Sequence, residues 1–263
     1  MLGSDDSDFE MRLATDAVDL EGAQRLRYVV FVEELGGDGA LVDHEQRFER
    51  DRFDPFFDHL VLIDKSLDPA TRDHVVGVYR LMRQDAAEQA GRFYSEDEYD
   101  LTPLRASGRP LLELGRSCVH ADYRGSAALL LLWQGLGDYV TDHGIELLFG
   151  VASFHGTDLE ALKHPLAWLH YNHGAPEDLR PRALDSAFAP MDVLARDAVD
   201  RAAALRSLPP LLKSYLRLGG TVGEGAFVDH AFNTTDVLIV MDTATLSARQ
   251  RALYGRDGPG AQP

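Results

Sequence analysis

Apolar and polar positions along the middle of the chain follow a strand–helix–strand order. Leu111–Val119 has the apolar composition of a strand, with Gly115 in its middle. Over residues 127–140, apolar side chains recur at three- and four-residue steps, which predicts an amphipathic helix. Residues 145–152 are apolar almost throughout, as expected of a strand that is buried on both faces.

The turn before this predicted helix, residues 122–126, places an arginine and a glycine where a helix exposes unpaired N–H groups. Such a turn can hold a phosphate. It contains neither GxGxxG nor GxxxxGK[ST], so neither a dinucleotide-binding fold nor a P-loop is indicated. On spacing alone, an ordinary strand-to-helix connection with a solvated arginine is the better interpretation.

The other elements follow from the same two periodicities, with Asp16 as a helix N-cap. Further strands are expected at residues 9–14, 59–64, 75–82 and 235–241. Further helices are expected at residues 16–35, 84–90, 158–173, 192–206 and 211–218. The segment 91–109 shows no clear period and is expected to be irregular.

No repeat and no low-complexity linker divides the chain, so we expect one α/β domain over residues 1–254. Its core should cover about residues 9–155, followed by a C-terminal elaboration over about residues 156–254. Hydrophobic residues make up 45% of the chain, which is enough for a sizeable core. The Gly- and Pro-rich end, residues 255–263, is expected to be disordered.

Net charge and cysteine content disfavour several classes of function. The formal net charge of −17 disfavours general nucleic-acid binding and adhesion to anionic lipid by charge. The single cysteine, Cys118, fits a reducing cytoplasm, and its place in an apolar strand indicates a buried residue rather than a nucleophile. The N-terminus lacks a signal-peptide pattern, and the longest apolar run, residues 127–133, is too short to span a bilayer. We expect a cytoplasmic protein.

Charged residues in apolar strands are more informative than surface charges. Three such residues are Arg80, Glu113 and Arg116. An unpaired charge inside a sheet is costly, so each must face outward or meet an opposite charge. A nearby acidic loop carries Glu49, Asp51 and Asp54, which would bind an ammonium group or hold arginines that shape an acceptor site. In so acidic a chain, a solvated loop remains the simpler interpretation.

Two further candidates carry no catalytic signature. Ser153 lacks the glycines that a hydrolase nucleophile needs two residues to either side, because Val151 and His155 occupy those places. Three histidines of one predicted helix match no metal-binding spacing, so we expect no metal. They are His164, His170 and His173.

Long sequence blocks, in order over nearly the whole chain, carry a resemblance to a known family. The blocks are RLRYVVFVEELGG (25–37), FDHLVLID (57–64), VVGVYRLMRQ (75–84), FYSEDEYDL (93–101), LELGRSCVHADYRG (112–125), LLWQGL (131–136), LFGVASFHGTD (148–158), LPPLLKSYLRLGG (208–220) and VDHAFNTTDVLIV (228–240). They resemble the bacterial ornithine N-acyltransferases, which make lyso-ornithine lipid from a 3-hydroxyacyl carrier protein and ornithine.

This resemblance implies the GCN5-related N-acyltransferase (GNAT) fold, an α/β (α+β) fold with a mixed central sheet flanked by helices. It also implies an acyl carrier protein as partner, ornithine as acceptor, and no cofactor beyond the phosphopantetheine that carries the acyl group. Because the implied product is an amphiphile, we expect transient peripheral contact with the inner membrane.

A second family, the acyl-homoserine lactone synthases, shares part of the pattern. The matching residues are Arg27 and Phe31 of the first helix, Glu49, Asp51 and Asp54 of an ExDxxD, Arg80 of a strand, and Glu113 and Arg116 of an ExxR. In that family these groups form a charged cluster beside the acceptor site. The resemblance implies the same role here.

The resemblance also implies where the acyl donor binds. Arg124, Gly125 and Ser126 would hold its phosphate, with Ser153 and Phe154 beside the donor. GNAT enzymes that use coenzyme A usually carry R/Q-x-x-G-x-G/A here, whereas residues 124–129 read RGSAAL. The single phosphodiester of a carrier protein's phosphopantetheine suits this altered loop.

For the chemistry, we expect Glu113 to orient or deprotonate the amine, and backbone N–H groups near Gly115 to polarise the thioester carbonyl. A regular strand would place Glu113 and Arg116 on opposite faces. We therefore expect a β-bulge between them, with Gly115 at the break and both charged side chains on the pocket side.

Two alternative functions stay open. The acceptor could be S-adenosylmethionine, as in a lactone synthase, or another amino acid. The chain could also be an acyl-binding module that does not turn over. Purified protein given 3-hydroxyacyl carrier protein and ornithine separates these alternatives by its product.

Overall fold

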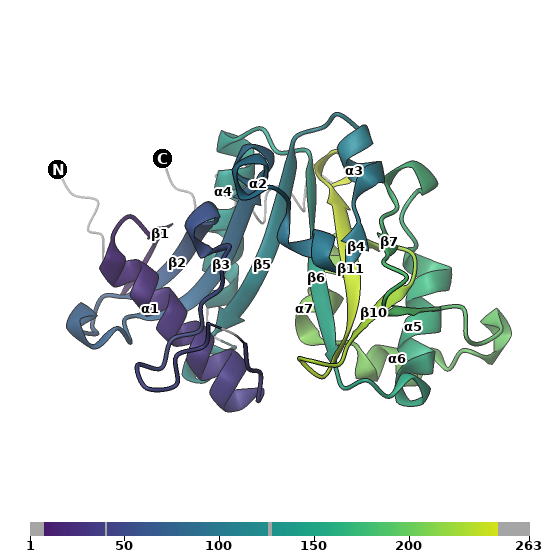
Figure 1. Cartoon of the computed structure of the whole chain (residues 1–263), viewed down its shortest axis with the longest axis horizontal. Helices are drawn as coiled ribbons and strands as arrows, with labels where there is room; N and C mark the ends of the chain where they lie inside the picture. The colour runs from purple at the N-terminus through teal and green to yellow at the C-terminus, as the bar shows by residue number, and fades with distance from the viewer. Residues whose placement is uncertain (1–7, 40, 126–127, 247–263) are drawn as a thin grey trace. The chain divides into compact units, whose positions relative to one another are not determined.

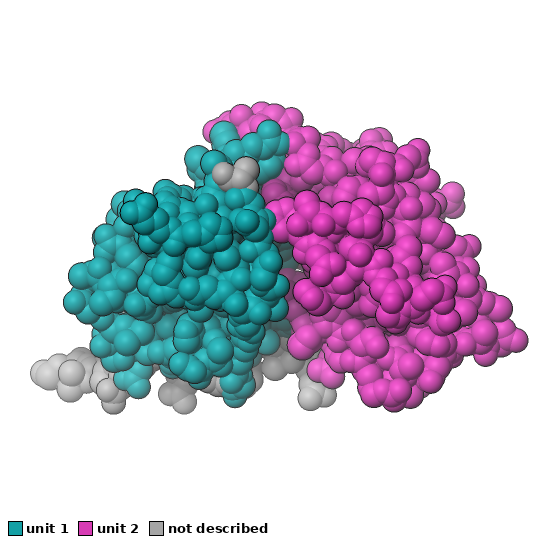
Figure 2. All heavy atoms as spheres, turned by 60° about the horizontal axis from the view of Figure 1, so that its bottom comes forward, with its two compact units in different colours: residues 1–82, 114–143, 251–263 teal, residues 83–113, 144–250 magenta. Residues whose placement is uncertain are grey.

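The computed structural model describes residues 8–39, 41–125 and 128–246 (Figure 1). The chain divides into two compact units, coloured separately in Figure 2. The first comprises residues 1–82, 114–143 and 251–263, and the second comprises residues 83–113 and 144–250. The tail expected at residues 255–263 lies outside the described residues, and the single-domain organisation stays a prediction.

The first unit is built on strands in the order β1-β2-β3-β5. These strands are β1 (Phe9–Leu13), β2 (Asp58–Asp64), β3 (Val75–Arg83) and β5 (Leu111–Val119). The pairs β1–β2 and β2–β3 are antiparallel, with Leu13 opposite Leu60 and Leu60 opposite Tyr79. The boundary between the units passes through β5, so Leu111–Glu113 belong to the second unit.

Side chains along β2 point alternately to the two faces of the sheet, and each face of the first unit packs against one helix. Val61 and Ile63 pack with Ala23 and Leu26 of α1 (Ala17–Arg27). On the other face lies α4 (Ala128–Asp142), which contacts β1 and β2. A Cβ on Gly135 of α4 would lie 2.8 Å from the Met11 side chain, and one on Gly77 of β3 would lie 2.8 Å from Leu132. The small residues therefore let α4 approach the sheet closely.

The first helix has two parts. Asp16 caps α1, as expected, and accepts a hydrogen bond from the Asp19 N–H. After Arg27 the chain continues as a π-helix, Tyr28–Glu34, and ends before the glycines at 36 and 37. The total length matches the prediction for residues 16–35. The wider π turn, which is common at functional sites, was not predicted.

The second unit is built on strands in the order β5-β6-β11-β10-β8, with β9 also paired to β11. β6 (Leu147–His155) and β11 (Thr234–Asp242) pair antiparallel over their whole length. Leu111–Glu113 of β5 run parallel to β6. The remaining strands of this unit are short: β4 (Tyr99–Asp100), β7 (Arg182–Ala183), β8 (Phe188–Ala189), β9 (Thr221–Val222) and β10 (Ala226–Asp229).

The helices of the second unit match the prediction in three of four places. They are α2 (Gln84–Ala90), α3 (Thr102–Ala106), α5 (Leu159–His173), α6 (Arg201–Ser207) and α7 (Pro210–Arg217). The helix expected at 192–206 is wrong: only Arg201–Ser207 is α-helical, because Asp200 caps there and accepts from the N–H groups of residues 202 and 203. The expected irregular segment 91–109 contains α3 and β4.

Cys118 is buried, as its place in an apolar strand predicted. Burial raises the pKa of its thiol to about 12. The side chain packs in the apolar cluster with Val61 and Val78. The prediction that this cysteine is a buried core residue is confirmed, and its raised pKa disfavours the reactive thiolate.

Candidate active site

Six residues expected at the acceptor site come together in the first unit as one arginine–carboxylate cluster. They are Arg27 of α1, Arg80 of β3, Arg116 of β5, and Glu49, Asp51 and Asp54 of the loop before β2. Four separate stretches of chain therefore meet here. Three cations face three anions, so the charges balance.

The two buried arginines form the centre of the cluster. Arg27 donates from Nε to Glu49 and from Nη1 to Asp54 Oδ1 at 2.7 Å. Arg80 donates from Nη1 to Asp51 Oδ2 at 2.6 Å and to the same Asp54 oxygen at 2.8 Å. Arg80 therefore pairs with carboxylates rather than facing solvent, which was one of its two predicted arrangements.

Arg116 closes the cluster from the solvent side. Its Nε lies 3.2 Å from Glu49 Oε1 and its Nη2 lies 3.4 Å from Asp51 Oδ2, so its hydrogen bonds are longer. The second oxygen of Asp54 accepts from Gln24 Nε2 at 3.1 Å. Each of the three carboxylates in the cluster is thus already engaged by at least one arginine.

Burial and charge act against each other in this cluster. The Arg27 and Arg80 side chains are fully buried. Burial alone would raise the pKa of Glu49, but Arg116 and Arg27 outweigh it and hold the pKa at about 2. Burial likewise opposes ionisation of Asp54, and Arg27 and Arg80 lower its pKa. Burial lowers the pKa of His59, which hydrogen-bonds the Asp54 carbonyl, to about 4.

The backbone of β5 leaves the extended conformation at Arg116, where φ is +48°. Such a value is uncommon for a residue other than glycine and costs on the order of 1–3 kcal/mol. The sequence predicted a break at residues 114–116 with Gly115 as the unusual residue. The left-handed φ instead belongs to Arg116, one residue later. Gly115 faces the cluster, since a Cβ there would lie 3.9 Å from the Arg80 guanidinium.

Arg80 also lies against an aromatic ring. Its guanidinium carbon is 4.2 Å from the centre of the Phe57 ring. A cation over an aromatic face is stabilised electrostatically, most strongly where water is excluded. Phe57 therefore adds a contact on one face of a guanidinium whose edge is bound by Asp51 and Asp54.

Glu113 lies in the second unit and holds a turn. Its carboxylate accepts from the N–H of Tyr94 at 2.8 Å, from the N–H of Ser95 at 2.6 Å, and from the Ser95 hydroxyl. The side chain is buried. It therefore anchors the 3₁₀ turn Tyr94–Asp97 at its N-terminal end. A shared pocket side for Glu113 and Arg116 stays a prediction.

The predicted donor turn is partly described. Arg124 donates from Nη1 and Nη2 to the two carboxylate oxygens of Glu34, at 2.5 and 2.7 Å, and from Nε to the Val119 carbonyl. Gly125 has φ +85°, which favours glycine. Ser126 lies outside the described residues.

The remaining predicted residues lie in different surroundings. Phe31 is part of the π-helix and packs at the edge of the apolar cluster of the first unit. In the second unit, Phe154 is buried, and Ser153 lies opposite Asp236 in the β6–β11 register. The Ser153 hydroxyl hydrogen-bonds the Asp236 carboxylate.

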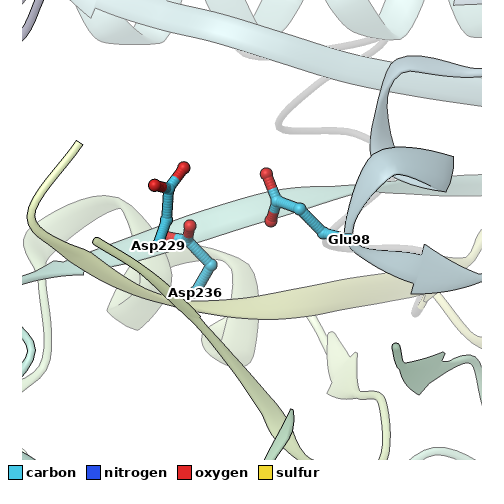
Figure 3. Close-up of side chains that lie close together, drawn as sticks. All are labelled: Glu98, Asp229 and Asp236. Carbon is cyan, nitrogen blue, oxygen red and sulfur yellow. The ribbon is translucent and has the colours of Figure 1, made fainter. Parts of the chain in front are cut away.

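Among the described residues, one group has the geometry to hold a cation, and no motif in the sequence predicted it. Glu98, Asp229 and Asp236, here called the acid trio, have ligand oxygens within 4.8 Å of one another (Figure 3). A signal was available for Asp236, because it is a lone carboxylate in an apolar strand. Arg80 is informative for the same reason, as a charged residue in an apolar strand.

Comparison with known proteins places these features in a family. A family model described as an acetyltransferase (GNAT) domain matches residues 26–134. An L-ornithine N(alpha)-acyltransferase of Rhodobacter capsulatus is 62% identical over 248 residues, which cover 94% of this chain and 95% of that protein. The chain belongs to the L-ornithine N(alpha)-acyltransferase family. The relative of that name from Brucella abortus is 43% identical, over 94% of this chain and 89% of its own length.

Membership of this family confirms the resemblance stated from the sequence blocks, and the predicted GNAT-like α/β fold with a mixed sheet is confirmed with it. Among solved structures, the AHL synthase LasI aligns over 94% of both chains with 15% identity and a TM-score of 0.49. Within the described residues of this ornithine acyltransferase family member, no helix is long and apolar enough to cross a membrane.

Proposed function

We propose that this protein transfers a 3-hydroxyacyl group from an acyl carrier protein to the α-amine of ornithine. The observation that carries the proposal is the 62% identity, over nearly the full length of both chains, to a protein named L-ornithine N(alpha)-acyltransferase. Identity at this level over both units favours a shared acceptor and a shared position of acylation.

The reaction is acyl transfer from sulfur to nitrogen. The α-ammonium of ornithine loses a proton, and its nitrogen attacks the thioester carbonyl carbon. The C–S bond then breaks, and the phosphopantetheine thiol leaves with a proton. Backbone N–H groups that point at the developing oxyanion would lower the barrier. The left-handed φ at Arg116 supports this role for the backbone around Gly115, because such a residue turns its N–H away from a regular ladder.

In this proposal the arginine–carboxylate cluster is a rigid support rather than the ammonium site. Its three carboxylates already bind arginines, and an incoming ammonium would have to displace one of them. The cluster connects the loop of Glu49–Asp54 to β3 and β5, and so it fixes the backbone around Gly115. We likewise give Glu113 a positioning role, because both of its oxygens hold the 94–95 turn.

We propose that the donor phosphate binds at the turn of Arg124 and Gly125. Support comes from the positive φ of Gly125 and from the exposed position of the Arg124 guanidinium. Arg124 is paired with Glu34, so phosphate would compete with this carboxylate. Replacing Arg124 with alanine should raise the KM for the acylated carrier protein more than it changes kcat.

Purified protein tests the proposal directly. The enzyme is incubated with ornithine and a 3-hydroxyacyl group carried either by acyl carrier protein or by coenzyme A, and N-acyl ornithine is followed by mass spectrometry. We expect product with strong preference for the carrier protein. Equal kcat/KM for the two donors would refute the donor assignment, and the absence of N-acyl ornithine with both would refute the acceptor.

A further inference from the structure

The acid trio lies wholly within the second unit, where two paired strands and one turn carry it. Asp236 is on β11, opposite Phe227 of β10. Asp229, two residues further along β10, lies on the same face of the sheet as Phe227 and is therefore a diagonal neighbour of Asp236. Glu98 directly follows the 3₁₀ turn Tyr94–Asp97. Figure 3 shows the three side chains together, with Glu98 pointing toward the two aspartates.

Hydrogen bonds of the backbone and of the next residue fix the position of Glu98. Its carbonyl accepts from the Leu184 N–H at 2.8 Å. Tyr99 is fully buried, and its hydroxyl donates to the carbonyls of Gly225 and Asp236, at 2.9 Å each. These bonds attach the turn to β11, so the Glu98 side chain reaches the aspartates from a fixed backbone.

Asp229 is oriented by the turn that follows it. Its Oδ1 accepts from the N–H of Ala231 at 2.7 Å and from the N–H of Phe232 at 3.0 Å. Both bonds are made to one oxygen, so Oδ2 remains for a further partner. Carboxylates that bind metal ions are commonly held by hydrogen bonds of this kind. The backbone thus meets part of the charge of Asp229 and also sets the direction of the carboxylate.

Asp236 supplies the observation that points to a ligand. It is 3% exposed. The hydroxyl of Thr234 donates to its Oδ2 at 3.1 Å, and that of Ser153 also hydrogen-bonds the carboxylate. Its Oδ1, however, has no hydrogen-bond partner within the described residues. A buried carboxylate oxygen without a donor costs free energy, and a cation between this oxygen and the two neighbouring carboxylates would remove that cost.

The ligand atoms indicate the class of cation. The group consists of three carboxylates, so it offers oxygen and neither sulfur nor imidazole nitrogen. Oxygen ligands are typical of hard cations such as Ca²⁺, Mg²⁺ and Mn²⁺, whereas zinc sites usually contain cysteine or histidine. The trio therefore suits a hard divalent cation.

The spacing of the oxygens favours one of these ions. Two oxygens on one ion lie at most twice the metal–oxygen distance apart. That limit is roughly 4.6–5.2 Å for Ca²⁺ and only about 4.2 Å for Mg²⁺. The trio oxygens lie within 4.8 Å of one another, which suits Ca²⁺ with little adjustment. Ca²⁺ also accepts irregular geometry, whereas Mg²⁺ demands a near-ideal octahedron.

We propose that the acid trio is a calcium site that joins the turn before β4 to strands β10 and β11. Glu98, Asp229 and Asp236 each supply one oxygen, and water completes the six to eight ligands that Ca²⁺ takes. With only three protein carboxylates, the Kd should be roughly 10⁻⁴–10⁻³ M. The expectation of no metal rested on histidine spacing, which carries no information about a carboxylate site. The role of the ion is structural, and it does not depend on the proposed function.

Calorimetry with CaCl₂ tests the site after treatment of the protein with a chelator and dialysis. The unmodified protein should bind one Ca²⁺, and Mg²⁺ should bind more weakly. Asp236→Asn and Glu98→Gln should each weaken Ca²⁺ binding by about tenfold or more, because each removes a charged ligand. Asp178→Asn changes an exposed carboxylate of the same unit and is the matched control. It should bind Ca²⁺ as the unmodified protein does.

Thermal unfolding gives a second measurement and checks the fold of each variant. At about 10 mM Ca²⁺, the Tm of the unmodified protein and of the control should rise by roughly 3–10 °C. The two trio variants should unfold cooperatively and lack this rise. If one of them fails to fold, the other still tests the site.

Three results would overturn the proposal. The first is the absence of both Ca²⁺ binding and a Tm shift in the unmodified protein. The second is binding that persists in both trio variants, which would place the ion elsewhere on this acidic protein. The third is Mg²⁺ binding as tight as that of Ca²⁺, which would refute the assignment of the ion. None of these measurements involves acyl transfer, so failure of the site is distinguishable from failure of the proposed function.

Discussion

The arginine–carboxylate cluster and the acid trio are two gatherings of carboxylates with opposite electrostatics. In the cluster, three carboxylates meet three arginines, and each acid is engaged. In the trio, three carboxylates meet one another, and Asp236 and Asp229 have no ion-pair partner within the part of the chain that is described. Both groups are largely buried, so water does not compensate either of them fully.

This difference in pairing distinguishes a group that stabilises the fold from a group that could bind a ligand. A buried ion pair is satisfied in the folded protein, and removing one partner strands the other. In the trio, Oδ1 of the buried Asp236 has no hydrogen-bond partner among the described residues, and such an oxygen costs free energy until a donor or a cation binds it. The acidic loop of Glu49, Asp51 and Asp54 thus holds arginines, whereas the acid trio lies where no spacing in the sequence predicts a cluster.

The largest expected effect comes from breaking the cluster at its centre. Asp54→Asn should lower the free energy of unfolding by about 3–5 kcal/mol, because Arg27 and Arg80 both lose a buried counter-charge. Urea unfolding measures the effect. Asp51→Asn, whose side chain is 19% exposed, is the matched control and should lose clearly less.

Acid should act on the cluster through Glu49. Its folded pKa of about 2 lies below the ordinary 4.5, so its contribution is complete above pH 4.5 and is lost as pH falls toward 2. The loss should reach roughly 3 kcal/mol. Unfolding of Glu49→Gln and of the unmodified protein at several pH values tests this. Parallel curves between pH 5 and pH 2.5 would contradict the assignment.

The trio should respond to pH in the opposite direction. The folded pKa of Asp236, about 6, lies above its ordinary value of 3.8, so ionisation destabilises the fold. In metal-free protein, stability should therefore fall by roughly 2–3 kcal/mol as pH rises from 4 to above 6. Asp236→Asn should lack this fall and be at least as stable as the unmodified protein at pH 7.

The smallest effect is expected at an exposed ion pair. Glu34 and Arg124 form two hydrogen bonds, yet their side chains are 39% and 43% exposed. Solvent and salt screen such pairs, so Glu34→Gln should change the free energy of unfolding by less than about 1 kcal/mol. A loss comparable to that of Asp54→Asn would show that hydrogen-bond geometry, rather than burial, sets the ranking.

Periodicity predicted most of the fold, because its long strands and helices bury one or both faces. Leu111–Val119 and Gln84–Ala90 match their predicted bounds. Short strands such as β8 and β9 have too few residues to show a period. The run of three alanines that suggested a helix at residues 192–206 lies at 202–204, within α6 (Arg201–Ser207), whereas the stretch 192–200 holds only two alanines and three aspartates.

The cluster could be predicted because it is built from charges in apolar strands and from an acidic spacing shared with a second family. The trio could not, because Glu98 and Asp229 are ordinary acids in an acidic chain and lie 131 residues apart. Only pairing of β10 with β11 brings Asp229 to Asp236. Asp236 carried the one usable signal, a lone charge among apolar strand residues.

The arrangement of the cluster along the chain has a consequence for folding order. Its partners are separated by 22 to 67 residues, and they come from a helix, a loop and two strands. Closing loops of this length costs entropy before any contact is gained, and an arginine desolvated before its carboxylate arrives is penalised. The charges must therefore stay hydrated until all four stretches are in place. Burial of Arg27 and Arg80 is then a late step, and variants of Asp54 should accelerate unfolding more than they slow folding.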